Sequence, residues 1–116
     1  MILTAHQPVY LPWLGLFHKI AIADLFCFFD IVQYQRKDYN NRNKIKTGNG
    51  ELWLSVPVES KGHLHKNVAE ILIVQDNWAK KHLKSIELNY KKAPFFQNYF
   101  PELQSILINN SKYTLG

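Results

Sequence analysis

His6 and Gln7 are adjacent side chains that together could carry out acid–base chemistry. An imidazole titrates near neutral pH and can accept or donate a proton, while a neighbouring amide can orient a substrate. The pair follows the strand candidate Ile2–Ala5 and precedes Pro8 and Pro12, which restrict the backbone of the turn. Two interpretations stay open: a catalytic or phosphate-binding pair, or a histidine that only hydrogen-bonds the turn and shapes it.

A polar, basic stretch between residues 36 and 46 could bind an anion. Its triplet Asn41-Arg42-Asn43 predicts a fixed site, because a guanidinium flanked by amides can hold a phosphate with two parallel hydrogen bonds. Tyr34 and Tyr39 could instead stack on nucleic-acid bases, and a solvated loop is the third interpretation. The positively charged residues of the stretch are Arg36, Lys37, Arg42, Lys44 and Lys46, opposed by Asp38.

Other residues that could ligate a metal or act as nucleophiles have simpler explanations. His63 and His65 would lie on the same side of an extended segment, but a metal needs a further ligand and the sequence offers none nearby, so we predict no metal site. His82 lies between Trp78 and Ile86 on one helical face, which is typical of a packed residue. Cys27 sits in an apolar run and is predicted to be a small buried residue.

The elements that must position His6 form a strand–helix–strand unit. The patterns predict a strand at Ile2–Ala5, a helix at Trp13–Ala23 and a strand at Leu25–Phe29. The last is short and uniformly apolar, which predicts a strand buried on both faces and paired in parallel with the first. Asp30 would then lie on the same rim of the sheet as His6. Gly15 would allow a close approach of the backbone that a side chain would block.

A hairpin and helices are predicted for the rest of the chain. Asn43–Lys46 and Glu51–Val58 flank the turn Gly48-Asn49-Gly50, and Pro57 predicts an edge or the end of the second arm. The remaining predictions are a strand at Ala69–Val74, a helix capped by Asp76 and running to about Tyr90, and a helix at Pro94–Ile108, broken or kinked near Pro101. The predicted fold class is therefore α/β, with a small mixed sheet begun by the strand–helix–strand unit.

Length and composition favour one domain that binds anions. The chain has 116 residues, and its formal net charge of +5 attracts phosphorylated small molecules as readily as nucleic acid. No apolar run is long enough to span a bilayer, and no charged leader begins the sequence. We therefore expect a cytoplasmic protein without membrane insertion.

Short motifs that agree in order and spacing run from residue 3 to about residue 100. They are His6-Gln7-Pro8, Tyr10-Leu11-Pro12-Trp13-Leu14-Gly15, Lys19-Ile20, Ala23-Asp24, Asp30, Val32-Gln33, Asn41-Arg42-Asn43, Trp53-Leu54, Val56-Pro57-Val58, Trp78, Tyr90 and Ala93-Pro94. In these motifs the chain resembles the WbqC-like protein family. The resemblance implies a bacterial protein of surface polysaccharide (O-antigen or lipopolysaccharide) biosynthesis. It also implies a longer family fold, of which residues 1–116 would be the N-terminal half, a single domain truncated at its C-terminus.

The resemblance and the residues together give a site hypothesis. The activity would be that of a transferase, acyl or aminoacyl, acting on a phosphorylated or nucleotide-linked amino sugar, with no cofactor indicated and a homo-oligomer as one possible state. His6 and Gln7 would be catalytic, and the substrate-binding residues would be Tyr10, Lys19, Asp30, Gln33, Asn41, Arg42 and Asn43. The alternative is a non-catalytic module that binds an assembly complex or, less favoured, nucleic acid through residues 36–46.

Overall fold

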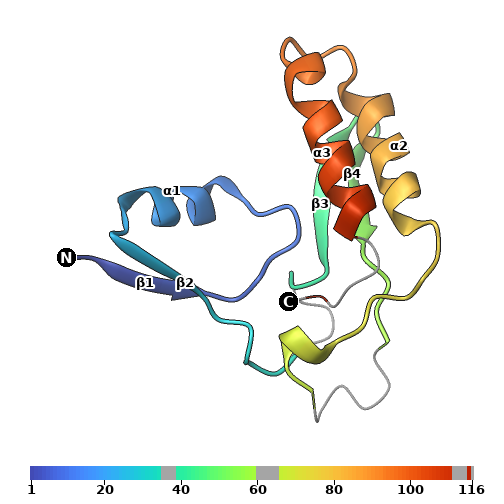
Figure 1. Cartoon of the computed structure of the whole chain (residues 1–116). Helices are drawn as coiled ribbons and strands as arrows, with labels where there is room; N and C mark the ends of the chain where they lie inside the picture. The colour runs from blue at the N-terminus through green and yellow to red at the C-terminus, as the bar shows by residue number, and fades with distance from the viewer. Residues whose placement is uncertain (35–38, 60–65, 111–114, 116) are drawn as a thin grey trace.

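The computed structural model describes residues 1–34, 39–59, 66–110 and 115. Its elements confirm the α/β class. They are β1 (Leu3–His6), α1 (Leu14–Ile22), β2 (Leu25–Phe28), β3 (Arg42–Thr47), β4 (Gly50–Ser55), the 3₁₀-helix η2 (Val68–Glu70), α2 (Trp78–Tyr90) and α3 (Phe96–Asn110) (Figure 1). The strands divide between two two-stranded sheets, β1–β2 and β3–β4.

The N-terminal unit has the predicted topology. β1 pairs with β2 in parallel, from Leu3 opposite Leu25 to His6 opposite Phe28, and α1 connects the two strands. The amide of Phe29 continues this pairing by donating to the carbonyl oxygen of His6, at 2.8 Å. The end of β1 and the segment after β2 therefore lie side by side at one rim of the sheet.

The prediction that β2 is buried on both faces is wrong. Leu25 is 57% exposed and Phe28 is 60% exposed, and Cys27 is exposed rather than buried. The apolar side chains of α1 are also mostly uncovered, and Leu16 is the buried residue of this helix. The reason is the small sheet: β1, β2 and α1 lie to one side of the hairpin and the later helices (Figure 1). Apolar side chains such as Leu14, Phe17 and Ile22 therefore stay exposed.

The β3–β4 hairpin confirms the predicted antiparallel pair. Arg42 lies opposite Ser55, and Thr47 lies opposite Gly50, next to the turn. Gly50 has φ of +113°, a conformation that strains residues with a side chain. β4 ends at Ser55, shortly before Pro57, as the missing amide hydrogen of proline requires.

The predicted strand at Ala69–Val74 is wrong. Val68–Glu70 form the 3₁₀-helix η2 instead, because the side chains of Asn67 and Glu70 each accept a hydrogen bond from the other residue's backbone amide. This reciprocal capping favours a turn over an extended chain. Among the described residues, the pairing of this segment includes an isolated bridge between Ile73 and Val58 rather than a continuous strand.

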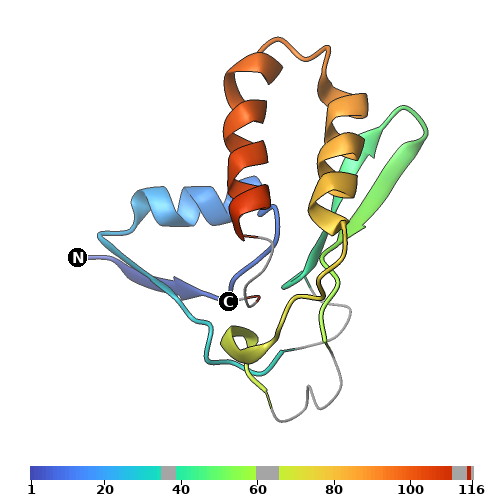
Figure 2. The same ribbon diagram turned by 45° about the vertical axis from the view of Figure 1, so that its right-hand side comes forward.

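The helices α2 and α3 stand together beside the hairpin (Figure 2). α2 begins at Trp78, whose amide donates to the carboxylate of Asp76 at 2.7 Å, so Asp76 caps the helix although Asn77 holds the N-cap position. α3 runs through Pro101 as one helix. No helix among the described residues is long and apolar enough to cross a membrane. The main core cluster comprises Val56, Ile73, Trp78, Ala79, Leu83 and Leu107.

Candidate functional site

The loop between β1 and α1 is tied to the start of the hairpin. The amide of Tyr10 donates to the carbonyl of Tyr39 at 3.2 Å. The side-chain amide of Asn43 donates to the carbonyls of Tyr10 and Leu11, at 3.2 and 2.9 Å. Leu11 has φ of +46°, in the left-handed region that strains residues with a branched side chain. Asn43 therefore supports a strained turn of the loop.

Asn40, just before β3, also ties the loop between β1 and α1 to the hairpin. It was not among the predicted site residues. Its side chain is buried, and its amide nitrogen donates to the carbonyl of Pro8 at 2.9 Å and to Oε1 of Gln7 at 3.3 Å. Because Oε1 of Gln7 is the acceptor, its amide nitrogen is the group left to donate elsewhere. The amide-rich run that begins at Asn40 was the available signal, but only its Asn41-Arg42-Asn43 portion was interpreted as a site.

Two adjoining hollows open where this loop meets the hairpin. Their volumes are about 250 and 370 Å³, and they share Trp13 and Tyr39 as walls. Together they match the size of a small-molecule site. The described lining residues include no Lys, Arg, Asp or Glu and offer rings and amides; they are His6, Gln7, Val9, Trp13, Tyr39, Asn40 and Asn43. We call this the loop–hairpin pocket.

His6 is the titratable imidazole of this pocket. Its Nδ1 donates to the carbonyl oxygen of Gln7 at 2.8 Å, so in the neutral ring Nε2 carries the lone pair. The edge of Trp13 packs against the ring, with the centroids 5.3 Å apart. A ring held in this tautomer can accept a proton through Nε2, which is what a general base needs.

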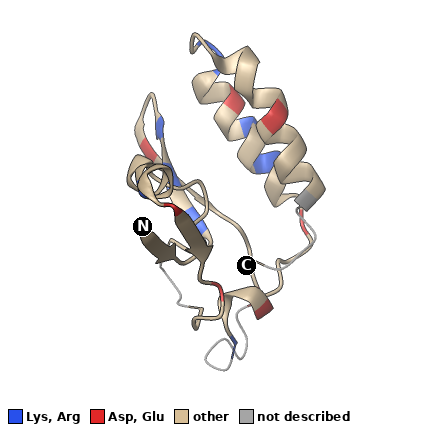
Figure 3. Ribbon diagram, turned by 60° about the vertical axis from the view of Figure 1, so that its left-hand side comes forward, with Lys and Arg blue, Asp and Glu red and all other residues tan. Residues whose placement is uncertain are grey.

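Positive charge lies next to the pocket, on the hairpin. The guanidinium of Arg42 lies 4.4 Å from the ring centre of Trp53, and that ring lies 6.0 Å from Tyr39, a wall of the pocket. Lys44 also approaches Trp53, at 5.2 Å, but its ammonium pairs with Glu51 at 2.8 Å, and this contact raises the pKa of Lys44. Figure 3 shows the Lys and Arg residues of the hairpin and of α2.

Several predicted substrate-binding residues make contacts within the fold instead of lining the pocket. The hydroxyl of Tyr10 bonds Nδ1 of His82, and burial raises the pKa of Tyr10 above its usual range. The ammonium of Lys19 donates to the carbonyl of Ala5 at 2.8 Å, which joins α1 to β1. The amide nitrogen of Asn41 donates to the carbonyl of Val56 at 2.9 Å.

Asp30 and Gln33 follow β2 and meet the segment around η2. The carbonyl of Asp30 accepts a hydrogen bond from the amide of Ala69 at 3.0 Å, and Gln33 forms an isolated bridge with Asn67. Neither residue is among the described residues that line the loop–hairpin pocket. Their proposed role toward the substrate stays a prediction.

The two tyrosines considered for base stacking have different environments. Tyr34 is 3% exposed and packs with Val68 and Ile71, so it is unable to stack on a ligand. Tyr39 is 43% exposed. The predictions on Arg36, Lys37, Asp38, His63 and His65 lie outside the described residues.

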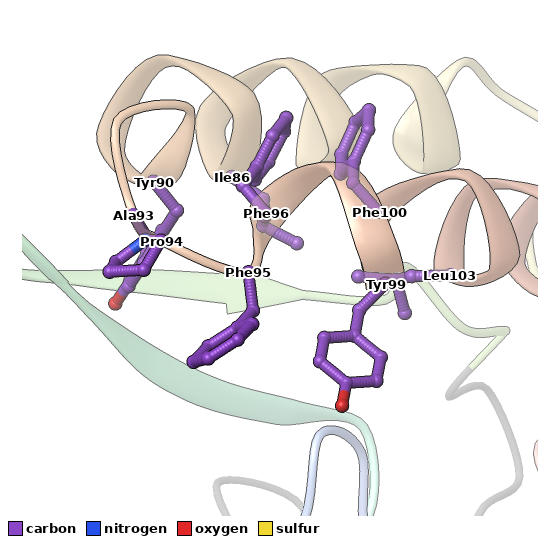
Figure 4. A pocket seen from close by; sticks show the side chains of 9 residues that line it. All are labelled: Ile86, Tyr90, Ala93, Pro94, Phe95, Phe96, Tyr99, Phe100 and Leu103. Atoms are coloured by element: carbon purple, nitrogen blue, oxygen red, sulfur yellow. The ribbon is translucent and has the colours of Figure 1, made fainter.

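A third hollow, of about 330 Å³, lies where α2 passes into α3 (Figure 4). Its wall is apolar and aromatic, with the phenol rings of Tyr90 and Tyr99 as the polar side chains among its lining residues. It lacks the imidazole and amides of the loop–hairpin pocket. The chemistry of the loop–hairpin pocket is therefore the better basis for a functional site.

Comparison with known proteins gives a family match over nearly the whole chain. A model of the WbqC-like protein family matches residues 7–115. Among curated proteins, the uncharacterized protein Rv1507c of Mycobacterium tuberculosis (strain ATCC 25618 / H37Rv) is 44% identical over 110 residues, which is 95% of this chain and 48% of that protein. The chain thus spans about half the length of this relative. No solved structure matches the chain.

Proposed function

Because the chain belongs to the WbqC-like protein family, we propose that it contributes the N-terminal part of a transferase of bacterial surface polysaccharide biosynthesis, acting on a phosphorylated or nucleotide-linked amino sugar. The observation that carries this proposal is the loop–hairpin pocket. It combines the imidazole of His6 with amide groups from the loop and the hairpin, between the rings of Trp13 and Tyr39. A sugar ring presents apolar C–H faces and several hydroxyl groups, which suit such a wall.

The charge distribution supports binding of the sugar and its phosphate at separate positions. The described lining residues of the pocket include no Lys or Arg, so the uncharged sugar ring fits there. Arg42 would hold the phosphate: its guanidinium lies over Trp53, one aromatic ring beyond Tyr39. An Arg side chain suits this role because its planar donors match two phosphate oxygens.

His6 would act as the general base in transfer of an acyl or aminoacyl group to the sugar amine. The amine nitrogen attacks the carbonyl carbon of an activated ester or thioester, a C–N bond forms, and the bond to the carrier breaks. Nε2 of His6 takes the proton that the nitrogen loses and returns it to the departing carrier. Gln7, which lies beside His6 and has its amide nitrogen available to donate, would orient the substrate.

Calorimetric titration tests the substrate class. The wild-type chain is titrated with UDP-glucosamine, UDP-galactosamine and dTDP-4-amino-4,6-dideoxyglucose, each of which carries a free amino group, and we expect binding of at least one. Arg42→Ala should weaken this binding about tenfold or more, since it removes a charge-assisted contact. Lys44→Ala is the matched control on the same strand, because Glu51 already engages its charge, and should change the affinity little.

Two results would count against the proposal. Equal affinity of the wild type and Arg42→Ala would remove Arg42 as the phosphate-binding residue. Failure of every nucleotide sugar to bind, both to this chain and to a relative of full length, would remove the substrate class.

The hairpin surface supports a second candidate, a binding module for single-stranded nucleic acid or an assembly complex. Arg42 and Lys44 both lie over Trp53, which is partly exposed, and basic groups beside rings are typical of single-strand binding. Binding of oligonucleotides that weakens steeply with salt would support it. Absence of binding at low salt would exclude nucleic acid as the partner.

A further inference from the structure

Asn40 carries a buried oxygen that has no hydrogen-bond donor within the described chain. Asn40 is 4% exposed, and its Oδ1 is among the buried side-chain atoms without a partner. Buried polar atoms of folded proteins almost always have a partner, and one that lacks it calls for an explanation such as a ligand. Asn40 also lines the smaller hollow of the loop–hairpin pocket, so a bound molecule could supply the donor.

The orientation of the Asn40 side chain is determined by its neighbours. Its nitrogen donates to two oxygens, the carbonyl of Pro8 at 2.9 Å and Oε1 of Gln7 at 3.3 Å. Rotating the amide by half a turn would place Oδ1 against the carbonyl oxygen of Pro8, where two acceptors would repel each other. The oxygen is therefore the atom of this amide that a ligand must satisfy.

His6 adds a second acceptor to the same hollow. Because Nδ1 of His6 donates to the carbonyl of Gln7, Nε2 of the neutral ring is an acceptor. A single ligand atom that satisfies both His6 and Asn40 needs two hydrogens. An amino nitrogen has them, a single hydroxyl has one, and a phosphate or carboxylate oxygen has none at neutral pH.

We infer that Asn40 is a specificity-determining residue of this pocket, and that its Oδ1 accepts a hydrogen bond from the amino nitrogen of the sugar. This inference rests on the proposed function for the identity of the ligand. It adds which atom of the protein distinguishes an amino sugar from sugars without nitrogen. It also gives a physical reason for the distinction, because a ligand lacking the donor leaves a buried acceptor unpaired.

The test compares matched ligands in matched variants by calorimetry. The tightest-binding of the three nucleotide sugars named above is compared with the analogue in which hydrogen replaces the amino group. We expect the wild type to prefer the nitrogen-containing sugar about tenfold or more. In Asn40→Ala the ratio of the affinities for the two sugars should fall close to one. Asn89→Ala is the control: this exposed amide of α2 also donates to a backbone carbonyl, that of Ser85, and its loss should leave the preference unchanged.

A measurement in the wild type covers the case in which Asn40→Ala fails to fold. The side-chain amide resonances of Asn40 in a ¹⁵N–¹H spectrum should shift on addition of the amino sugar and stay in place with the deoxy analogue. If the preference for nitrogen survives in folded Asn40→Ala, or if the Asn40 resonances respond equally to both sugars, this inference is overturned while the proposed function stands. If no sugar binds either to the wild type or to a relative of full length, the proposed function and this inference are both overturned.

Discussion

The hydroxyl of Tyr10 donates a hydrogen bond to Nδ1 of His82 at 2.8 Å, across 72 positions of the sequence. The direction follows from the other ring nitrogen, since Nε2 of His82 lies 3.0 Å from the carbonyl oxygen of Ser55 and must carry the hydrogen. The three residues join the loop after β1, the end of β4 and α2. This network holds one wall of the loop–hairpin pocket in register with the main core.

Tyr10→Phe should lower the free energy of unfolding by about 1–3 kcal/mol. The change removes one hydroxyl and leaves the lone pair of His82 buried without a donor, which costs more than the loss of an exposed bond. Urea denaturation followed by circular dichroism measures the effect. Tyr99→Phe is the control, because Tyr99 is exposed on α3. Removing its hydroxyl should change the free energy of unfolding by no more than about 0.5 kcal/mol. Equal midpoints for the two variants would show that the Tyr10–His82 bond adds nothing to stability.

Stability should fall as the pH is lowered through the range in which His82 titrates. Burial lowers the pKa of His82, although the Ser55 carbonyl and the charge of Asp76 act in the opposite direction. The unfolded chain, with a histidine pKa of about 6.5, then binds a proton at a higher pH than the folded chain does. Protons therefore favour unfolding below about pH 6.5. The free energy of unfolding should fall by at most about 1.4 kcal/mol per pH unit until the pH drops below the pKa of His82 in the folded chain.

Unfolding measured between about pH 7.5 and pH 5 in the wild type and in His82→Gln checks this prediction. Glutamine can donate to Ser55 and accept from Tyr10 without titrating. The variant should lose part of the slope, whereas His18→Gln, at an exposed position of α1, should retain it. A slope that is the same in His82→Gln and the wild type would assign the pH dependence to other groups.

Asn43→Ala should destabilise the chain by about 1–3 kcal/mol. The substitution removes both side-chain hydrogen bonds to the carbonyls of Tyr10 and Leu11. The left-handed backbone of Leu11 then loses the contacts that stabilise it. Thermal unfolding measures the loss. Asn109→Ala is a suitable comparison, since this exposed amide donates to the hydroxyl of Ser105 on its own helix. If both variants lose the same stability, Asn43 has no special role in the loop.

Gly15→Ala should weaken sugar binding without lowering stability. An added Cβ would lie 2.3 Å from Nε1 of Trp13, so the indole must leave its place in the pocket wall. Alanine favours the helix by about 1 kcal/mol over glycine, which offsets the cost of this movement. We expect a changed tryptophan fluorescence and an affinity at least about tenfold lower, because misplaced groups cost binding and rate steeply.

Gly48→Ala is the control for this change, because a Cβ there meets nothing within 4 Å. It should leave both the fluorescence and the affinity unchanged. Unaltered fluorescence in Gly15→Ala would show that the indole has room to accept the methyl group.

Local patterns were enough to predict most of the elements. The apolar runs around Leu3 and Leu25 predicted a parallel pair, and the glycines about Asn49 predicted the hairpin turn, because each depends on residues close in sequence. The 3₁₀-helix at Val68–Glu70 was missed, since its capping residues Asn67 and Glu70 compete with an apolar pattern that favours a strand. The exposure of β2 was missed as well, because burial depends on what covers a strand rather than on its own composition.

The amino-acid sequence by itself determined the α/β class, the family and the placing of His6 and Gln7 at the end of the first strand. Only the tertiary structure decided which polar groups meet. It turned Tyr10, Lys19 and Asn41 toward partners within the fold, and it brought the buried amide of Asn40 to the carbonyl of Pro8, 32 positions earlier. The physical reason is that periodicity reports the side of an element on which a residue lies, whereas hydrogen-bond partners distant in sequence are selected by the packing of whole elements.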